Sequence, residues 1–132
     1  MTLQSLSGST ETVMGYLYIL LTVFLTAYGQ LILKWRMNAL NQPPAPLLEK
    51  FWFLFRIIFD PFIFSGFFAA FLASLTWMAA LSRFQLSFAY PFMSLAFVVV
   101  MLCSYVFLDE ALTAQKILGL ALIIVGLVVA SR

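Results

Sequence analysis

Two polar side chains interrupt an apolar stretch of the chain and could bind a polar molecule within a membrane. Gln30 and Lys34 stand four residues apart in the segment "YGQLILKWRM". Such residues are costly in hydrocarbon and often mark functional sites. Lys34 could supply the cation for an anionic group, and the Gln30 amide could bond to hydroxyl groups. Alternatively, Lys34 snorkels to lipid phosphates at the edge of the bilayer.

These two residues belong to a longer series of polar side chains on one side of a predicted helix. The series recurs every four residues and comprises Tyr18, Thr22, Thr26, Gln30 and Lys34. At about 3.6 residues per turn, this spacing produces a slowly drifting ridge. The threonines could bond to their own backbone, or the whole ridge could line a water-accessible cavity. We favour the cavity for the ridge as a whole.

A shorter polar set in a later segment could face this ridge. It contains Ser87, Tyr90 and Ser94, with Pro91 among them. Pro91 removes a backbone hydrogen bond, so a carbonyl there must find another partner. Trp77, in the preceding segment, is either a wall of the cavity or an anchor at the membrane interface.

The composition explains where such residues must act. Hydrophobic residues make up 64% of the 132 residues, charged residues make up 9%, and the mean hydropathy is +1.07. A soluble domain of this size cannot bury so much apolar surface. The chain has no His and only one Cys, which excludes a Cys/His zinc site and an intrachain disulfide. A net charge of +2 does not indicate nucleic-acid binding. We expect no metal, no cofactor and no enzymatic site.

We predict an all-α integral membrane protein with a single membrane domain over residues 1–132. The predicted spans cover residues 15–33, 61–81, 86–108 and 111–130. The last span is the weakest, because its uninterrupted apolar run begins only at Ile117. Residues 47–60 mix aromatic and charged side chains, which is typical of an amphipathic helix at the interface. The other connections are short, so consecutive helices must be antiparallel neighbours.

The distribution of Lys and Arg predicts the orientation. Five basic residues flank the first and third connections, and two lie on the opposite side. The five are Lys34, Arg36, Lys50, Arg56 and Lys116, and the two are Arg83 and Arg132. Because positive charge is retained in the cytoplasm, both termini are predicted to lie outside.

Acidic residues are absent from the centre of every predicted span. They are Glu11, Glu49, Asp60, Asp109 and Glu110, all in tails, connections or span ends. A proton-coupled exporter of cationic drugs needs a carboxylate within the membrane. The fixed charges therefore favour an anionic substrate over a lipophilic cation.

Three motifs resemble the small four-helix branch of the drug/metabolite transporters, whose type is the small multidrug resistance protein. They are "GQLILK", "AYPFMSLAFV" and "FLDEALTAQKILGLALIIVG". The match is closer to the subunits of the undecaprenyl-phosphate–aminoarabinose flippase. The "QPPAP" connection and the amphipathic segment after it depart from the compact multidrug pattern.

The resemblance implies roles for particular residues. Thr26 stands where the multidrug proteins have an essential glutamate, which argues against proton-coupled drug export. Tyr90 matches a substrate-contacting tyrosine. Gly119 and Gly126 match a glycine pattern that mediates dimerisation. Small residues favour close helix contacts in lipid, and four short helices enclose little volume. We therefore expect a homodimer, or a heterodimer with a homologous four-helix subunit.

These observations support one main hypothesis and two alternatives. The main hypothesis is a flippase subunit that moves an undecaprenyl-phosphate-linked sugar, or a related anionic glycolipid, across the bacterial inner membrane. The phosphate would lie near Lys34, joined by Arg83 or Arg56, whichever faces the same leaflet. The sugar would contact Gln30, Thr26, Tyr90 and Ser94, with aromatic rings against its apolar face. The alternatives are an exporter of small metabolites or drugs, and a non-transporting partner of a membrane glycosyltransferase.

Overall fold

The computed structural model describes residues 3–40 and 46–132, and every regular element in this part of the chain is a helix. The elements are α1 (Leu3–Ala39), α2 (Leu47–Ile57), α3 (Pro61–Leu81), α4 (Leu86–Ala89), the 3₁₀-helix η1 (Tyr90–Ser94), α5 (Leu95–Phe107) and α6 (Ala114–Ala130). The predicted all-α fold class is confirmed.

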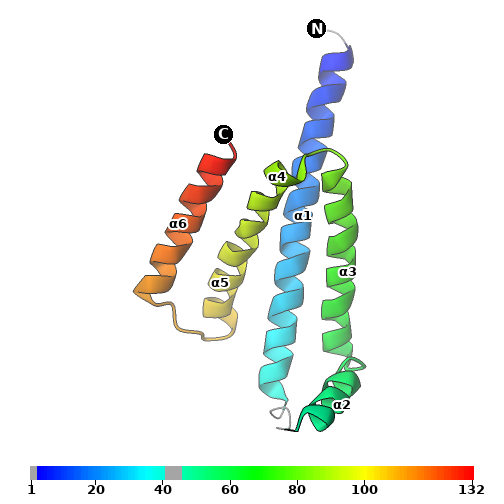
Figure 1. Cartoon of the computed structure of the whole chain (residues 1–132), viewed down its shortest axis with the longest axis vertical. Helices are drawn as coiled ribbons and strands as arrows, with labels where there is room; N and C mark the ends of the chain where they lie inside the picture. The colour runs from blue at the N-terminus through cyan, green and yellow to red at the C-terminus, as the bar shows by residue number, and fades with distance from the viewer. Residues whose placement is uncertain (1–2, 41–45) are drawn as a thin grey trace.

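The long helices stand side by side in the order α6, α5, α1 and α3 (Figure 1). Helix α1 packs most extensively against α3 and also contacts α5. Helix α6 lies on the outer side of α5 and contacts η1 and α5. The start of α1 and the end of α6 lie toward one end of the molecule, and α2 lies at the opposite end (Figure 1). Two arms, α3 and α5, are thus placed on either side of α1.

Three helical stretches of the described chain are long and apolar enough to cross a membrane. They are Gly8–Ala39, Pro61–Leu81 and Leu86–Phe107. The first extends beyond the predicted span 15–33 at both ends. The third is one residue shorter than predicted and is wound as a 3₁₀-helix at Tyr90–Ser94. Pro91 explains this change, because its ring cannot take its place in a regular α-helix without loss of a hydrogen bond.

The fourth apolar helix, α6, has 17 residues and is shorter than expected. The predicted start at residue 111 is wrong, because the helix begins at Ala114. Thr113 has extended backbone and its Oγ1 accepts from the Lys116 N–H at 3.3 Å. Threonine is a favoured N-cap residue, so the helix begins there. At about 1.5 Å per residue, α6 is about 25 Å long, somewhat less than a hydrocarbon core of about 30 Å.

The predicted amphipathic helix is present, but it ends at Ile57 rather than at residue 60. Asp60 caps the next helix instead, because its Oδ1 accepts from the Phe62 N–H at 3.0 Å and from the Ile63 N–H at 3.5 Å. Pro61 then occupies the first turn of α3, where no N–H is needed. Helix α2 has no buried residue, and its Leu48, Phe51 and Trp52 are all more than half exposed.

Helices α1 and α3 approach closely at a pair of glycines. A methyl group added to Gly66 would come within 2.8 Å of the Ile32 Cγ2, and one added to Gly29 would come within 3.1 Å of the Gly66 carbonyl oxygen. Ala69 and Ala73 continue this buried face of α3. Gly66, Ala69 and Ala73 of α3 therefore serve packing within one chain.

The outer helix differs, because it contributes no buried residue. A methyl group added at Gly119 or Gly126 would have no atom within 4 Å. Neither glycine is thus required for packing within the described chain. Their assignment to a dimer interface stays a prediction.

Candidate functional site

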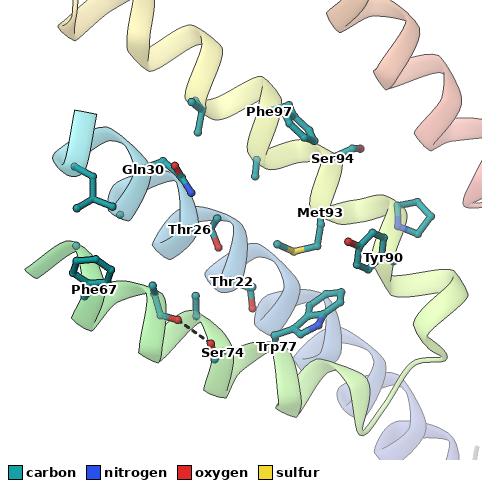
Figure 2. Close-up of a pocket in the computed structure, with 18 residues that line it drawn as sticks. Thr22, Thr26, Gln30, Phe67, Ser74, Trp77, Tyr90, Met93, Ser94 and Phe97 are labelled. Atoms are coloured by element: carbon teal, nitrogen blue, oxygen red, sulfur yellow. Dashed lines mark hydrogen bonds between the residues drawn. The ribbon is translucent and has the colours of Figure 1, made fainter. Parts of the chain in front are cut away.

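A cavity of about 940 Å³ lies between α3 and the η1–α5 segment, with α1 as its floor. Figure 2 shows the side chains that converge on it from these three elements. The lining residues are Thr22, Thr26, Gly29, Gln30, Leu33, Gly66, Phe67, Ala70, Ala73, Ser74, Trp77, Tyr90, Pro91, Met93, Ser94, Ala96, Phe97 and Val100. The close contact of Gly29 with Gly66 sets one edge, since it fixes α3 against α1.

The cavity brings together most of the residues that the sequence indicated as substrate-binding. Thr26, Gln30, Trp77, Tyr90 and Ser94 all line it. For Trp77, this position favours the cavity wall over the interface anchor. Their roles toward a substrate stay predictions. Lys34 and Arg83 are not among the lining residues and are described below.

The floor separates two kinds of threonine. The Thr22 side chain is buried, and its Oγ1 lies 2.7 Å from the Tyr18 carbonyl oxygen and 2.7 Å from the Thr76 Oγ1 of α3. Thr22 therefore bonds to its own helix, as the simpler interpretation of the ridge expects, and it also joins α1 to α3. Thr26 and Gln30 differ, because within residues 3–40 and 46–132 no protein group forms a hydrogen bond with their side chains. Both remain available to a ligand.

The α3 wall combines one engaged hydroxyl with two aromatic rings. The Ser74 Oγ donates to the Ala70 carbonyl oxygen at 3.0 Å, which is the dashed line in Figure 2. Phe67 lies toward one end of the wall and Trp77 toward the other (Figure 2). The Trp77 ring meets the Tyr90 ring of η1 edge to face, with 6.3 Å between ring centres. This aromatic pair offers an apolar surface beside polar atoms.

The η1–α5 wall owes its shape to the 3₁₀ turn at Pro91. Figure 2 shows Met93 extending from η1 toward α1, whereas Ser94 turns to the side on which α6 lies. The Ser94 Oγ is buried and has no hydrogen-bond partner among the described residues. A buried hydroxyl without a partner carries a desolvation cost of about 1–3 kcal/mol. A ligand that formed a hydrogen bond with the Ser94 hydroxyl would remove this cost.

No charged side chain lines the cavity, but Lys34 stands at one end of it. Lys34 follows the lining residue Leu33 and lies about one helical turn beyond Gln30. Its Nζ lies 4.0 Å from the Glu110 Oε1, and the two side chains are 55% and 40% exposed. The cation is therefore close to the cavity and only loosely paired.

The other predicted cation lies at the opposite end of the molecule. The Arg83 Nη1 lies 3.7 Å from the Glu11 Oε2, and its guanidinium stands 5.6 Å from the centre of the Tyr18 ring. Glu11 and Lys34 are separated by about 35 Å along α1. Arg83 therefore does not join Lys34. Arg56 belongs to α2, and this helix lies at the end of the molecule where α1 ends (Figure 1).

Several lining residues were not singled out from the sequence as substrate-binding. Thr22 was noted only as part of the polar ridge. Phe67, Met93 and Phe97 carried no signal, because the sequence contains 15 phenylalanines and six methionines in similar apolar surroundings. Only the positions of the three walls distinguish them from side chains that face lipid.

The cavity is suited to an uncharged, hydroxyl-bearing part of a ligand, and Lys34 at its end is suited to an attached anionic group. Hydroxyl and amide groups supply both donors and acceptors for it. The aromatic pair can lie against an apolar face of the ligand. A carboxylate that could neutralise a cationic drug is missing from the lining.

Comparison with known proteins decides the family. The model of the EamA-like transporter family matches residues 9–132, which include the whole cavity. The chain belongs to the EamA-like transporter family. The resemblance to the drug/metabolite transporters is thereby confirmed, and the chain is a multi-pass membrane protein of this family. No solved structure matches it significantly.

Several relatives of this chain bear the names of flippase subunits. A Shewanella sediminis (strain HAW-EB3) protein is 35% identical over 128 residues, or 90% of this chain and 88% of that protein. It is named a probable 4-amino-4-deoxy-L-arabinose-phosphoundecaprenol flippase subunit ArnF. An Erwinia tasmaniensis protein with the same name is 37% identical over 120 residues, or 86% of this chain and 91% of that protein. A Yersinia pseudotuberculosis serotype O:1b protein, named as subunit ArnE of the same flippase, is 32% identical over 119 residues, or 89% and 96% of the two chains.

Proposed function

We propose that this chain is a subunit of a flippase that moves an undecaprenyl-phosphate-linked monosaccharide across the bacterial inner membrane. The observation that carries the proposal is an uncharged, mostly apolar cavity that holds a few polar side chains and has a loosely paired lysine at its end. The names of the relatives support the same substrate class, because they describe a sugar attached to phosphoundecaprenol.

The head group of such a lipid matches the cavity part by part. The phosphate lies near Lys34, where a charge-assisted hydrogen bond is stronger than a neutral one. Arg56 is the second cation at that end. The sugar occupies the cavity, where Thr26, Gln30 and Tyr90 offer free polar groups and Ser94 offers a buried hydroxyl without a partner. Trp77 lies against its apolar face.

The long polyprenyl tail does not need a place in the protein. Tyr90 and Phe97 line the cavity and are each 65% exposed in the single chain, so the cavity is open on this side. The tail can remain among the lipids while the head group crosses. The protein then needs to shield only the polar part of its substrate, which a volume of about 940 Å³ can hold.

We propose a complete assembly of two such subunits, each crossing the membrane four times, with α6 as the shorter fourth span. The relatives carry two subunit names, which supports a heterodimer with a homologous subunit, and a homodimer is the alternative. Gly119 and Gly126 belong to the proposed contact. The excess of basic residues around Lys34 favours the cytoplasm for that end, so the substrate is loaded there.

Reconstitution tests the proposal. The protein, in the oligomeric form in which it is purified, is placed in liposomes with a labelled undecaprenyl phosphate-linked sugar, and access of the sugar to an external reagent reports its movement. We expect Lys34→Ala and Gln30→Ala each to reduce the translocation rate. The first removes the cation that binds the phosphate, and the second removes a contact with the sugar. Lys116→Ala is the matched control, because its Nζ donates to the Ala111 carbonyl oxygen away from the cavity. Unchanged rates in both cavity variants would show that the proposed site is wrong.

A further inference from the structure

Two basic residues near the end of α1 have very different partners. The Arg36 Nε and Nη2 donate to the Asp60 Oδ2 at 3.0 and 2.8 Å. These side chains are 28% and 16% exposed, and the Phe62 ring lies 5.3 Å from the guanidinium. Arg36 is therefore committed to joining α1 and α3. It is not free to bind an incoming anion.

Lys34 has a partner of the opposite kind. Its Nζ is 4.0 Å from the Glu110 Oε1, which is too far for a hydrogen bond, and both side chains are well exposed. Exposed pairs of this kind contribute little to stability and are screened by salt. The contact can open without loss of a packed structure.

The backbone nevertheless holds Glu110 at this place. The Glu110 N–H donates to the Ser104 carbonyl oxygen of α5 at 3.3 Å. The preceding residue, Asp109, has a φ of 53°, a conformation that Asp adopts more readily than most residues. This turn fixes the start of the α5–α6 connection beside the end of α1. The backbone of this turn thus holds Glu110 where its carboxylate can reach Lys34.

We propose that Glu110 is the resting counter-ion of Lys34 and that the phosphate of the transported lipid displaces it. This inference rests on the proposed function, which assigns the phosphate to Lys34. A phosphate group brings several oxygen acceptors within hydrogen-bonding distance of the ammonium, whereas Glu110 forms none of these bonds. Once the phosphate leaves, Glu110 returns to Lys34. The acidic residue therefore lowers the affinity for substrate and favours its release.

The test compares two neighbouring acids. Binding of undecaprenyl phosphate is measured by native mass spectrometry for the wild type, Glu110→Gln and Asp109→Asn, with undecaprenol as the tail without phosphate. Both substitutions remove one negative charge at nearly the same place, but only Glu110 lies beside Lys34. We expect Glu110→Gln to bind undecaprenyl phosphate roughly two- to fivefold more tightly, the range expected for an exposed pair. Asp109→Asn and the binding of undecaprenol should change little.

A lysine variant separates this inference from the proposed function. In Lys34→Gln, binding should weaken and the further change of Glu110→Gln should have no effect. If Lys34→Gln binds as well as the wild type, the phosphate site itself is wrong. If Lys34→Gln weakens binding but Glu110→Gln does not tighten it, or tightens it no more than Asp109→Asn does, only the role of Glu110 is wrong. Glu110→Ala repeats the measurement with a side chain that cannot hydrogen-bond.

Discussion

The polar side chains of the cavity are few, and they differ in their hydrogen-bond partners. Thr22 is used to join two helices, whereas Thr26 and Gln30, on the next two turns of the same helix, are left without protein partners. Ser94 is isolated by the 3₁₀ turn that contains it. A sugar can satisfy such groups with hydroxyls that act as both donors and acceptors. These individual side chains therefore favour the hydroxyl-bearing substrate that we propose.

Gly66 lets α3 approach α1 closely at one edge of the cavity. We expect Gly66→Ala to lower the unfolding free energy by about 1–3 kcal/mol, because overpacking forces side chains or backbone to move. The added methyl group would lie 2.8 Å from the Ile32 Cγ2 and 3.3 Å from the Leu33 Cγ. Thermal unfolding in detergent measures the change. Gly8→Ala is the matched control, since nothing lies within 4 Å of its added methyl group. Equal stability of Gly66→Ala and the wild type would contradict the close contact.

Asp60 makes the junction of α1 and α3 sensitive to acid. The hydrogen bonds from Arg36 lower the pKa of the Asp60 carboxyl below its ordinary value of 3.8. A carboxyl whose pKa is lower in the folded than in the unfolded state stabilises the fold at pH values above its unfolded-state pKa. This contribution is lost as the pH falls through its folded-state pKa. We therefore expect the wild type to lose stability below about pH 4, and Asp60→Asn to lack this part of the loss. Unfolding is measured between pH 3 and 7 for the wild type, Asp60→Asn and the control Glu49→Gln. If Asp60→Asn showed the same pH dependence as the wild type and the control, the stabilising role of the Arg36–Asp60 pair would be contradicted.

At the scale of elements, the break at Pro91 positions two of the predicted sugar contacts. Over the four steps from Tyr90 to Ser94, a 3₁₀-helix turns about 80° more than an α-helix does. We expect Pro91→Ala to restore regular α-helix and to rotate these side chains relative to each other. Affinity for the lipid-linked sugar should then fall roughly tenfold, the equivalent of one or two hydrogen bonds. Thermal stability should not fall.

Pro46→Ala provides the comparison for this change, because Pro46 caps α2 outside the cavity. Binding of the lipid-linked sugar and thermal unfolding are measured for both variants. An unchanged affinity in Pro91→Ala would show that the 3₁₀ turn does not shape the site.

Some helix boundaries and site residues could be predicted from the sequence, and others could not. The start of α3 was predictable because Asp60 and Pro61 form an N-cap followed by a first-turn proline. The start of α6 was missed by three residues because the cap at Thr113 was not recognised. Thr26 and Gln30 were identifiable, since polar groups in an apolar segment are conspicuous. Phe67 and Phe97 were not, because a ring that lines a cavity and a ring that faces lipid look alike in a sequence. Only the spacing of helices, set by contacts such as that of Gly29 with Gly66, tells them apart.

At the scale of the whole molecule, a single chain leaves the cavity open on one side. The cavity is open beside Tyr90 and Phe97, and α6 lies at the edge with no buried residue. Helices in lipid associate through close packing, which small residues permit. A second subunit against α6 would use the two glycines that the described chain does not need. Closure of the site and assembly are therefore expected to depend on each other.

A larger side chain on α6 separates assembly from folding. Gly126→Leu should not disturb the single chain, since nothing lies within 4 Å of an added methyl group. It should block the close approach of a partner helix, so native mass spectrometry should show monomers with unchanged helical content. Ala121→Leu, whose side chain projects about 140° away around the helix, should remain oligomeric. Because the site is open in a single chain, loss of the oligomer in Gly126→Leu should also abolish translocation. An oligomer that persists in this variant would exclude the glycine face of α6 as the contact.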